Sequence, residues 1–215
     1  MTHVPDVIDA LVGITPGSPL DVVRSQRPAA RENAQKSYLA LFAPAHPGGV
    51  SPAERFAVAL FVAGLHRHTA TAIHYRAGLS QHASEELVRA IDDEVRRGET
   101  SGPYGRYPAG PLTVEDVPGI VHRVADTNRK VLGDRLSAAL EHAHLLVYRP
   151  RDASSAALQA LLDAGWSSSD VVTLSQLVAF LAFQIRVVIG FRALAATSAI
   201  ADAYTARPIS PVAAA

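Results

Sequence analysis

The sequence predicts an all-α protein, and three observations support this. Several segments begin with a helix-capping residue and continue with apolar side chains at helical spacing. No segment alternates apolar and polar residues for long enough to predict a strand. Residues 51–79 also align without gaps with residues 167–195, and each segment opens with Ser followed by an acidic residue three positions later. This internal similarity predicts two related helical hairpins, packed on each other about a pseudo-twofold axis.

The first of these segments, residues 51–79, is the part around which the chain is organised. Ser51 can act as an N-cap, and Glu54 completes a capping box. Residues 56–65 are apolar on most sides and predict a buried helix. A polar elbow rich in histidine follows, and then a second helical run that carries His74 and Tyr75. This arrangement is typical either of a functional site or of a helical hairpin with a purely structural role.

Glycine and proline divide the rest of the chain. We expect an N-terminal helical arm (1–50), a first helical half (51–97), a Gly/Pro-rich linker (98–118), a second helical half (119–197) and a C-terminal tail (198–215), together forming one compact unit. The second half should contain helices at 119–130, 133–148 and 155–164 before the long apolar helix that starts at Ser167. His142 and His144 lie two residues apart and should therefore point to different faces of their helix.

The composition limits the classes of function. The chain has 215 residues with 20 Lys and Arg against 20 Asp and Glu, so no overall charge draws it to nucleic acid. It contains no cysteine, which excludes disulfides, thiolate metal sites and a cysteine nucleophile. The N-terminus does not resemble a signal peptide. Residues 171–196 are the most apolar, but Gln176, Gln184, Arg186 and Arg192 interrupt them. We therefore expect a core helix, no membrane span and a cytoplasmic protein.

The run SPAERFAVALFVAGL, the polar elbow and the helix with a histidine resemble the carboxymuconolactone decarboxylase and alkylhydroperoxidase D superfamily. The stretch LLDAGWSSSDVVTLSQLVAFLAFQIRVVIG resembles the corresponding part of its peroxidase-related branch. The resemblance covers roughly residues 35–195. It implies an alkylhydroperoxidase D-like helical fold and a homo-oligomer with active sites near the subunit contacts.

In the peroxidase branch the chemistry uses a Cys-x-x-Cys-x-x-x-His motif at the start of the helix after the elbow. If His74 is aligned with the family histidine, the cysteine positions hold Arg67 and Ala70. If Tyr75 is aligned there instead, they hold His68 and Thr71. Neither alignment supplies a sulfur, so the thiol cycle is unavailable to this chain. The decarboxylase branch works without the cysteine pair, which leaves a non-thiol activity open.

The resemblance makes His74, His68, Glu54 and Tyr75 the candidate catalytic residues, because histidine and carboxylate side chains move protons. For each there is a simpler interpretation: His74 as a hydrogen-bonded core residue, His68 as part of a polar elbow, and Glu54 as a cap. His66, His68 and His74 do not have the spacing of a metal site on a helix, and no acidic residue lies near them in sequence. We expect no metal and no cofactor.

Arg186, Gln184 and Gln176 are the candidate substrate-binding residues. Arg186 lies among apolar residues, where an unpaired guanidinium would be costly. It is therefore either part of a structural ion pair, for which Glu54 is a candidate partner, or hydrogen-bonded to backbone carbonyls, or the anchor of a substrate carboxylate. The glutamines on the same helix are then expected to line the same cavity.

Three functions follow from these observations. The first is a non-thiol activity on a small organic acid or lactone. The second is a non-catalytic, oligomer-forming subunit that works beside a separate thiol peroxidase. The third is a peroxidase by family label alone. A pocket that joins His74, Arg186 and Gln184 would favour the enzyme, and a solid core there with an apolar face at the surface would favour the partner subunit.

Overall fold

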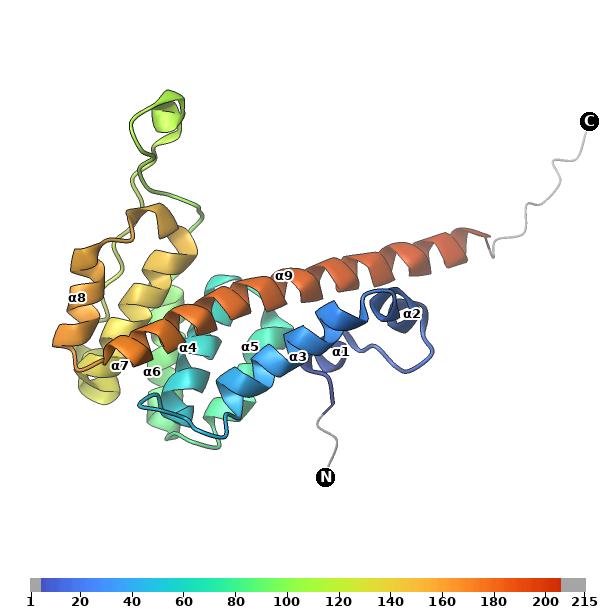
Figure 1. Ribbon diagram of the computed structural model, residues 1–215, viewed down its shortest axis with the longest axis horizontal. Helices are drawn as coiled ribbons and strands as arrows, with labels where there is room; N and C mark the ends of the chain where they lie inside the picture. Colours follow the sequence, from blue (N-terminus) through green and yellow to red (C-terminus); the bar gives the residue numbers. More distant parts are fainter. Residues whose placement is uncertain (1–4, 206–215) are drawn as a thin grey trace, which may run out of the picture.

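The computed structural model describes residues 5–205, and the side chains of residues 5–197. Within this range the protein is all-α, as predicted, with nine α-helices, two short 3₁₀ helices and no strand (Figure 1). The α-helices are α1 (Val7–Val12), α2 (Pro19–Ser25), α3 (Pro28–Phe42), α4 (Pro52–Leu65), α5 (Thr69–Leu79), α6 (Glu85–Gly98), α7 (Asp126–Tyr148), α8 (Ser155–Asp163) and α9 (Ser168–Thr205). The 3₁₀ helices are η1 (Pro111–Glu115) and η2 (Pro150–Asp152).

The N-terminal arm packs along the second half of α9 (Figure 1). Val7, Ile8 and Leu11 of α1 are buried there against Val188 of α9. Arg24 of α2 is also buried and forms ion pairs with two aspartates of the α1 region. The arm therefore belongs to the body of its own chain.

Helices α4 and α5 form the predicted hairpin, and the capping box at Ser51 and Glu54 is confirmed. The elbow between them turns at Arg67, whose φ of 55° lies in the left-handed region that side chains other than glycine seldom adopt. His68 then caps α5 by accepting a hydrogen bond from the backbone N–H of Thr71. Helix α4 is buried almost throughout and lies at the centre of the core, whereas α5 buries only Thr71, Tyr75 and Leu79.

The prediction of a second hairpin at residues 167–195 is wrong, because these residues form one continuous helix, α9. Its start does repeat the first: Ser167 and Asp170 form a reciprocal capping box. The difference comes at the elbow. The positions that match Arg67 and His68 are Phe183 and Gln184, and neither supplies a left-handed turn or a cap.

A single side chain joins the two helix starts. Arg135 of α7 donates to Glu54 at 2.7 Å and lies 3.4 Å from the Asp170 carboxylate, so it bridges the acidic residues of both capping boxes. It also donates to the carbonyl of Gly49 at 2.9 Å. Its guanidinium covers the Trp166 ring at 4.2 Å. The two similar segments are thus tied together at their N-termini and not along matching hairpins.

The helix expected at 119–130 begins only at Asp126, and residues 119–125 belong to no helix or strand. Two carboxylates explain the difference: Glu141 accepts from the N–H of Val124 at 3.1 Å, and Glu94 accepts from the N–H of Ala125 at 3.0 Å. The backbone donors are satisfied without helical bonds. Gly133 interrupts α7 with a φ of 74°, close to the predicted boundary between two helices.

The linker projects from the end of the molecule where α7 and α8 lie (Figure 1). It is anchored at its base, where the N–H of Tyr104 donates to the carbonyl of Tyr148 at 2.6 Å. Further along, the Tyr107 ring lies under the Arg151 guanidinium at 3.8 Å. The helical halves on either side of the linker contribute to one hydrophobic cluster, which contains most of α4 and the inner faces of α7 and α9.

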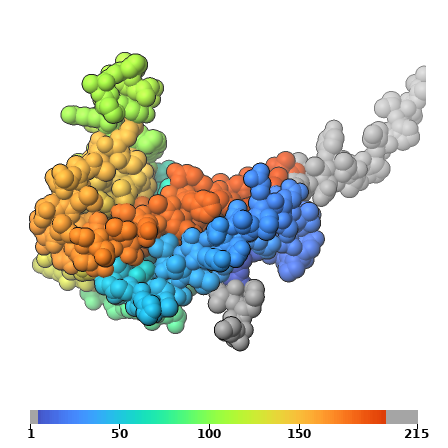
Figure 2. Space-filling model, in the orientation of Figure 1, coloured from blue at the N-terminus to red at the C-terminus, as the bar shows by residue number. Residues whose placement is uncertain are grey.

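Helix α9 is only half buried. Leu174, Leu177 and Leu181 face the core, whereas Val172 and Phe183 on the opposite face are exposed. Residues 168–197 are long and apolar enough to cross a membrane by length and composition, and 39% of the most apolar stretch is buried. Core helices of globular proteins have the same composition. Figure 2 shows the open side of α9 running across the visible face. The core-helix prediction is therefore right for one face of α9 only.

Candidate functional site

Two of the predicted catalytic residues form hydrogen-bonded pairs, Tyr75 inside the core and His74 in a half-buried position at its edge. Tyr75 is fully buried, and its hydroxyl donates to Oε1 of Gln184 at 2.5 Å. Beside it, Nε2 of His74 lies 3.1 Å from the hydroxyl of Tyr38. Burial raises the pKa of Tyr75 and lowers the pKa of His74. Both side chains are therefore neutral at neutral pH and join α3, α5 and α9 as uncharged polar links.

The other two predicted catalytic residues hold helix ends. His68 caps α5 through Nδ1, which also lies 2.7 Å from the hydroxyl of Thr71. Glu54 accepts from the backbone N–H of Ser51 at 2.7 Å and from Arg135. The capping interpretation of Glu54 is confirmed, and its proposed ion pair with Arg186 is wrong.

The predicted substrate-binding residues do not share one cavity. Gln184 is buried on the core side of α9 and paired with Tyr75, whereas Gln176 and Arg186 are exposed on the other side. The expectation that Arg186 is buried is wrong, because one face of α9 is open. Gln176 lines a groove between α3 and α9, and Arg186 lines a different cavity.

The cavity that contains Arg186 has a volume of about 670 Å³ and lies between α7 and α9; we call it the α7–α9 cavity. Its polar lining side chains are His66 from the elbow, Tyr148 from α7, and Ser175 and Arg186 from α9. Tyr148 donates to the carbonyl of Leu65 at 2.7 Å, and Ser175 donates to its own helix. These two are occupied, which leaves Arg186 and His66 as the groups that can meet a ligand.

Arg186 and His66 have complementary properties. Arg186 donates from one terminal nitrogen to the carbonyl of Ala182 at 2.8 Å, and among the described residues no carboxylate pairs with it. His66 has its Nε2 buried without a hydrogen-bond partner in the described part of the chain. Burial, and to a smaller degree the charge of Arg186, lower the pKa of His66. The cavity thus combines a permanent cation with a neutral imidazole.

A buried histidine–carboxylate cluster was missed by the sequence analysis. Glu94 of α6 is fully buried, and His122 lies 3.1 Å from it. The His122 ring stacks on His144 with centroids 4.9 Å apart, and Nε2 of His144 lies 2.9 Å from the carbonyl oxygen of Gly98. Asn128 donates to Glu94 at 2.6 Å. The sequence of α6 is amphipathic and rich in acidic residues, and only tertiary packing turns Glu94 inward.

This cluster is mainly structural. Burial lowers the pKa of His122, an effect that the neighbouring Glu94 opposes. Burial also lowers the pKa of His144, to about 4. The cluster fastens segment 119–125 onto α6 and α7. His142 points elsewhere, as its spacing from His144 predicted, and lines a second cavity.

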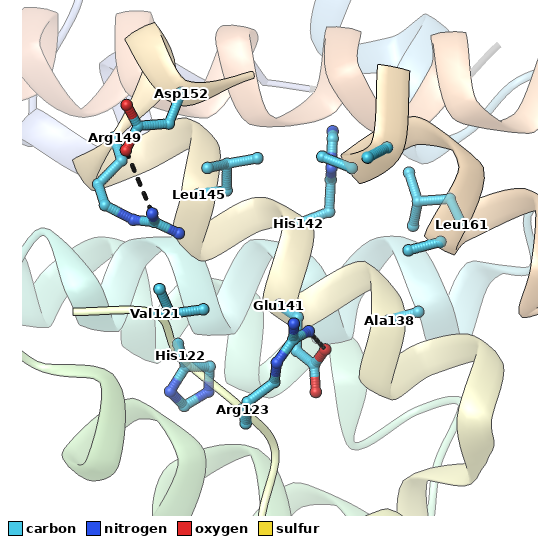
Figure 3. A pocket seen from close by; sticks show the side chains of 13 residues that line it. Val121, His122, Arg123, Ala138, Glu141, His142, Leu145, Arg149, Asp152 and Leu161 are labelled. Atoms are coloured by element: carbon cyan, nitrogen blue, oxygen red, sulfur yellow. Dashed lines mark hydrogen bonds and ion pairs between the residues drawn. The ribbon is translucent and has the colours of Figure 1, made fainter. Parts of the chain in front are cut away.

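The second cavity lies between α7, α8 and the segment 121–123 and has a volume of about 310 Å³; we call it the α7–α8 cavity (Figure 3). Figure 3 shows Arg149 with Asp152 at one end and Arg123 with Glu141 at another. His142 lies on the side toward Leu161. No sequence motif predicted this cavity, because its walls come from segments that are adjacent only in the fold.

Among the described residues no group of three or more His, Asp or Glu side chains is arranged to hold a metal ion. His66, His68 and His74 each have separate surroundings, described above. A scan against protein-family models gives no match to the chain, and a search of the curated proteins gives none either.

Proposed function

We propose that this protein binds a small organic acid in the α7–α9 cavity. The observation that carries the proposal is Arg186, a cation without a carboxylate partner among the described residues, on the wall of a 670 Å³ cavity. A guanidinium with free N–H groups is well matched to a carboxylate, because it can donate two parallel hydrogen bonds. The apolar side chains of Val178, Ala179 and Leu146 would hold the body of such a ligand.

The same geometry supports a non-thiol reaction by proton transfer. With its pKa lowered, His66 is neutral at neutral pH and can accept a proton. A carboxylate held by Arg186 would lie in the cavity that His66 also lines, where the neutral imidazole would be the group available to accept a proton. Lyase- or decarboxylase-type chemistry fits this pair, whereas thiol chemistry would need a separate protein because the chain has no cysteine. We keep the resemblance to the carboxymuconolactone decarboxylase and alkylhydroperoxidase D superfamily as part of this proposal.

Fluorine NMR with para-fluorobenzoate tests the binding. Because a charge-assisted hydrogen bond is worth about 1.5–3 kcal/mol, Arg186→Gln should weaken binding roughly tenfold or more. Arg186→Lys should retain part of the affinity, since it keeps the charge without the planar fork. Arg192→Gln is the matched control, because Arg192 is an exposed arginine of the same helix that does not line the cavity. Equal binding to wild type and Arg186→Gln would rule out this site.

A second function, assembly with other subunits, is favoured by the open face of α9. Val172, Gln176, Phe183 and Arg186 follow one another at helical spacing on this face, and Phe183 is 47% exposed. Two of the described cavities open along its edges. We propose that a second copy of the chain covers it, as a homo-oligomer, although a partner peroxidase subunit would fit the same apolar surface.

Light scattering at micromolar concentration tests this second proposal. The wild-type protein should show at least the mass of a dimer. Phe183→Glu places a charge at the centre of the open face and should shift the mass toward that of one chain. Leu158→Glu is a suitable control, because Leu158 is a similarly exposed apolar residue on α8. A wild-type protein with the mass of a single chain would contradict the assembly.

A further inference from the structure

We propose that the α7–α8 cavity is a second binding site, which takes a small uncharged molecule that carries a carbonyl oxygen. The proposal goes beyond the acid site of the α7–α9 cavity. Neither Arg186 nor His66 lines the α7–α8 cavity, and the two cavities use different residues of α7.

The α7–α8 cavity has room for a ligand because its walls are built from small side chains. Its apolar lining includes Ala138, Ala156, Ala157, Ala160, Leu145 and Leu161. Larger residues at the alanine positions would fill the space between α7 and α8, which now has a volume of about 310 Å³. That volume is at the lower end of the range for ligand sites, roughly 300–1,000 Å³. The ligand should therefore be small and largely apolar.

The charged groups around the cavity already compensate one another. Glu141 accepts hydrogen bonds from Arg123 at 2.6 Å and from Arg129 at 2.7 Å. Arg149 donates to Asp152 at 3.2 Å. A charged ligand would thus find no unpaired counter-charge, and no new ion pair would offset the free-energy cost of removing its hydration shell. This balance distinguishes the α7–α8 cavity from the α7–α9 cavity and favours an uncharged ligand.

Two buried nitrogen atoms of the lining residues lack partners in the described part of the chain. They are Nε of Arg149 and Nδ1 of His142, and residue His142 is 95% buried; a third such nitrogen, Nε2 of His122, lies 3.1 Å from the Glu94 carboxylate and is therefore set aside. Figure 3 shows both side chains around the same cavity, Arg149 from one end and His142 from the α8 side. The N–H at Nε of arginine is a donor only, so its natural partner is an acceptor oxygen.

A carbonyl oxygen fits these requirements. It can accept from Nε of Arg149 while the apolar part of the molecule lies against the alanine and leucine walls. Burial lowers the pKa of His142, so its ring is neutral and can donate to or accept from a second polar atom. Small ketones, esters and lactones belong to this class. A hydrocarbon of the same shape would leave the Arg149 donor unsatisfied.

The test compares three matched probes by fluorine NMR on the full chain. These are para-fluoroacetophenone, which carries a carbonyl, para-fluoroethylbenzene, which lacks an acceptor, and para-fluorobenzoate, which is charged. Because one hydrogen bond to a charged donor is worth about 1.5 kcal/mol or more, the ketone should bind about tenfold more tightly than the hydrocarbon. Its affinity should not change in Arg186→Gln, whereas that of the benzoate should fall.

Two variants locate the ketone. Ala160→Leu fills the α7–α8 cavity without removing a polar group and should abolish ketone binding, while Ala153→Leu, at an exposed position outside the cavity, should not. Arg149→Lys keeps a cation for Asp152 but removes the N–H at Nε, and should lower ketone affinity to that of the hydrocarbon. Should Arg149→Lys fail to fold, Ala160→Leu alone decides. Ketone binding that survives Ala160→Leu, or equal binding of ketone and hydrocarbon to the wild type, overturns the proposal.

Discussion

Replacement of Arg135 by alanine should be among the most destabilising changes at a residue that is still partly exposed. The Arg135 side chain is 29% exposed, yet it contacts four separate parts of the chain. It bonds to Glu54 at the start of α4, to Asp170 at the start of α9, and to the carbonyls of Gly49 and Gly165. Alanine would remove all of these bonds at once.

The size of the effect can be worked out from these contacts. The Glu54 and Asp170 carboxylates are only 15% and 11% exposed, so the ion pairs are less screened than surface pairs. The bond to Glu54 and the carbonyl bonds together contribute about 2 kcal/mol net. The cation–π contact with Trp166 adds about 0.5–1 kcal/mol. Both carboxylates keep their capping bonds, so the expected loss in the free energy of unfolding is about 3 kcal/mol.

Trp166 provides the assay. It is the single tryptophan of the chain, and its ring lies directly under the Arg135 guanidinium. Its fluorescence should report unfolding in urea, which, unlike guanidinium chloride, does not screen ion pairs. Arg135→Lys should give an intermediate stability, because lysine lacks the fork that joins several acceptors.

A control separates this bridge from ordinary surface charge. Arg89 pairs with Glu85 one turn away on α6 and is 74% exposed, so Arg89→Ala should change the free energy of unfolding by no more than about 0.5 kcal/mol. If Arg135→Ala lowers the free energy of unfolding as little as Arg89→Ala does, Arg135 does not hold the two helix starts together and the reasoning fails.

Three further predictions concern pH, a buried pair and the absence of thiols. Burial lowers the pKa of His144 from 6.5 to about 4. The unfolded chain therefore takes up a proton at His144 before the folded protein does, and the free energy of unfolding should fall by up to about 3 kcal/mol as the pH drops from 6.5 toward 4. Urea titrations at several pH values should show a shallower loss for His144→Phe. Tyr75→Phe should destabilise the fold by about 1–2 kcal/mol, and a double-mutant cycle with Gln184→Leu should show coupling, whereas additive effects would contradict the buried bond. The purified, metal-free protein should not turn over alkyl hydroperoxides with a dithiol reductant. The thiol peroxidase cycle needs a thiolate and a resolving thiol, and the chain has no cysteine. Turnover above the buffer blank would contradict this prediction.

The helix starts could be predicted from sequence because capping is a local interaction. The Ser51 and Glu54 box, the Ser84 cap of α6 and the Ser154 cap of α8 each depend on residues within one turn. The start of α7 could not be predicted, because Glu94 and Glu141 satisfy the backbone of residues 124 and 125 from distant positions. The same limit applies to the sites. A pattern search singles out His74 as a candidate, but which side of a helix faces a cavity is decided by packing.

The internal similarity shows why a shared start does not fix a shared fold. Residues 51–65 and 167–181 both form helices that begin with a Ser and acidic capping box. The outcome is then decided by the next few residues. In the first segment Arg67 takes a left-handed conformation and His68 caps a new helix, so the chain turns back. In the second, Phe183 disfavours that conformation, and Gln184 uses its side chain to bind Tyr75 of the first hairpin. The helix that cannot turn therefore runs on beyond Gln184, and this extension supplies the residues of α9, among them Val188, against which α1 and α3 pack.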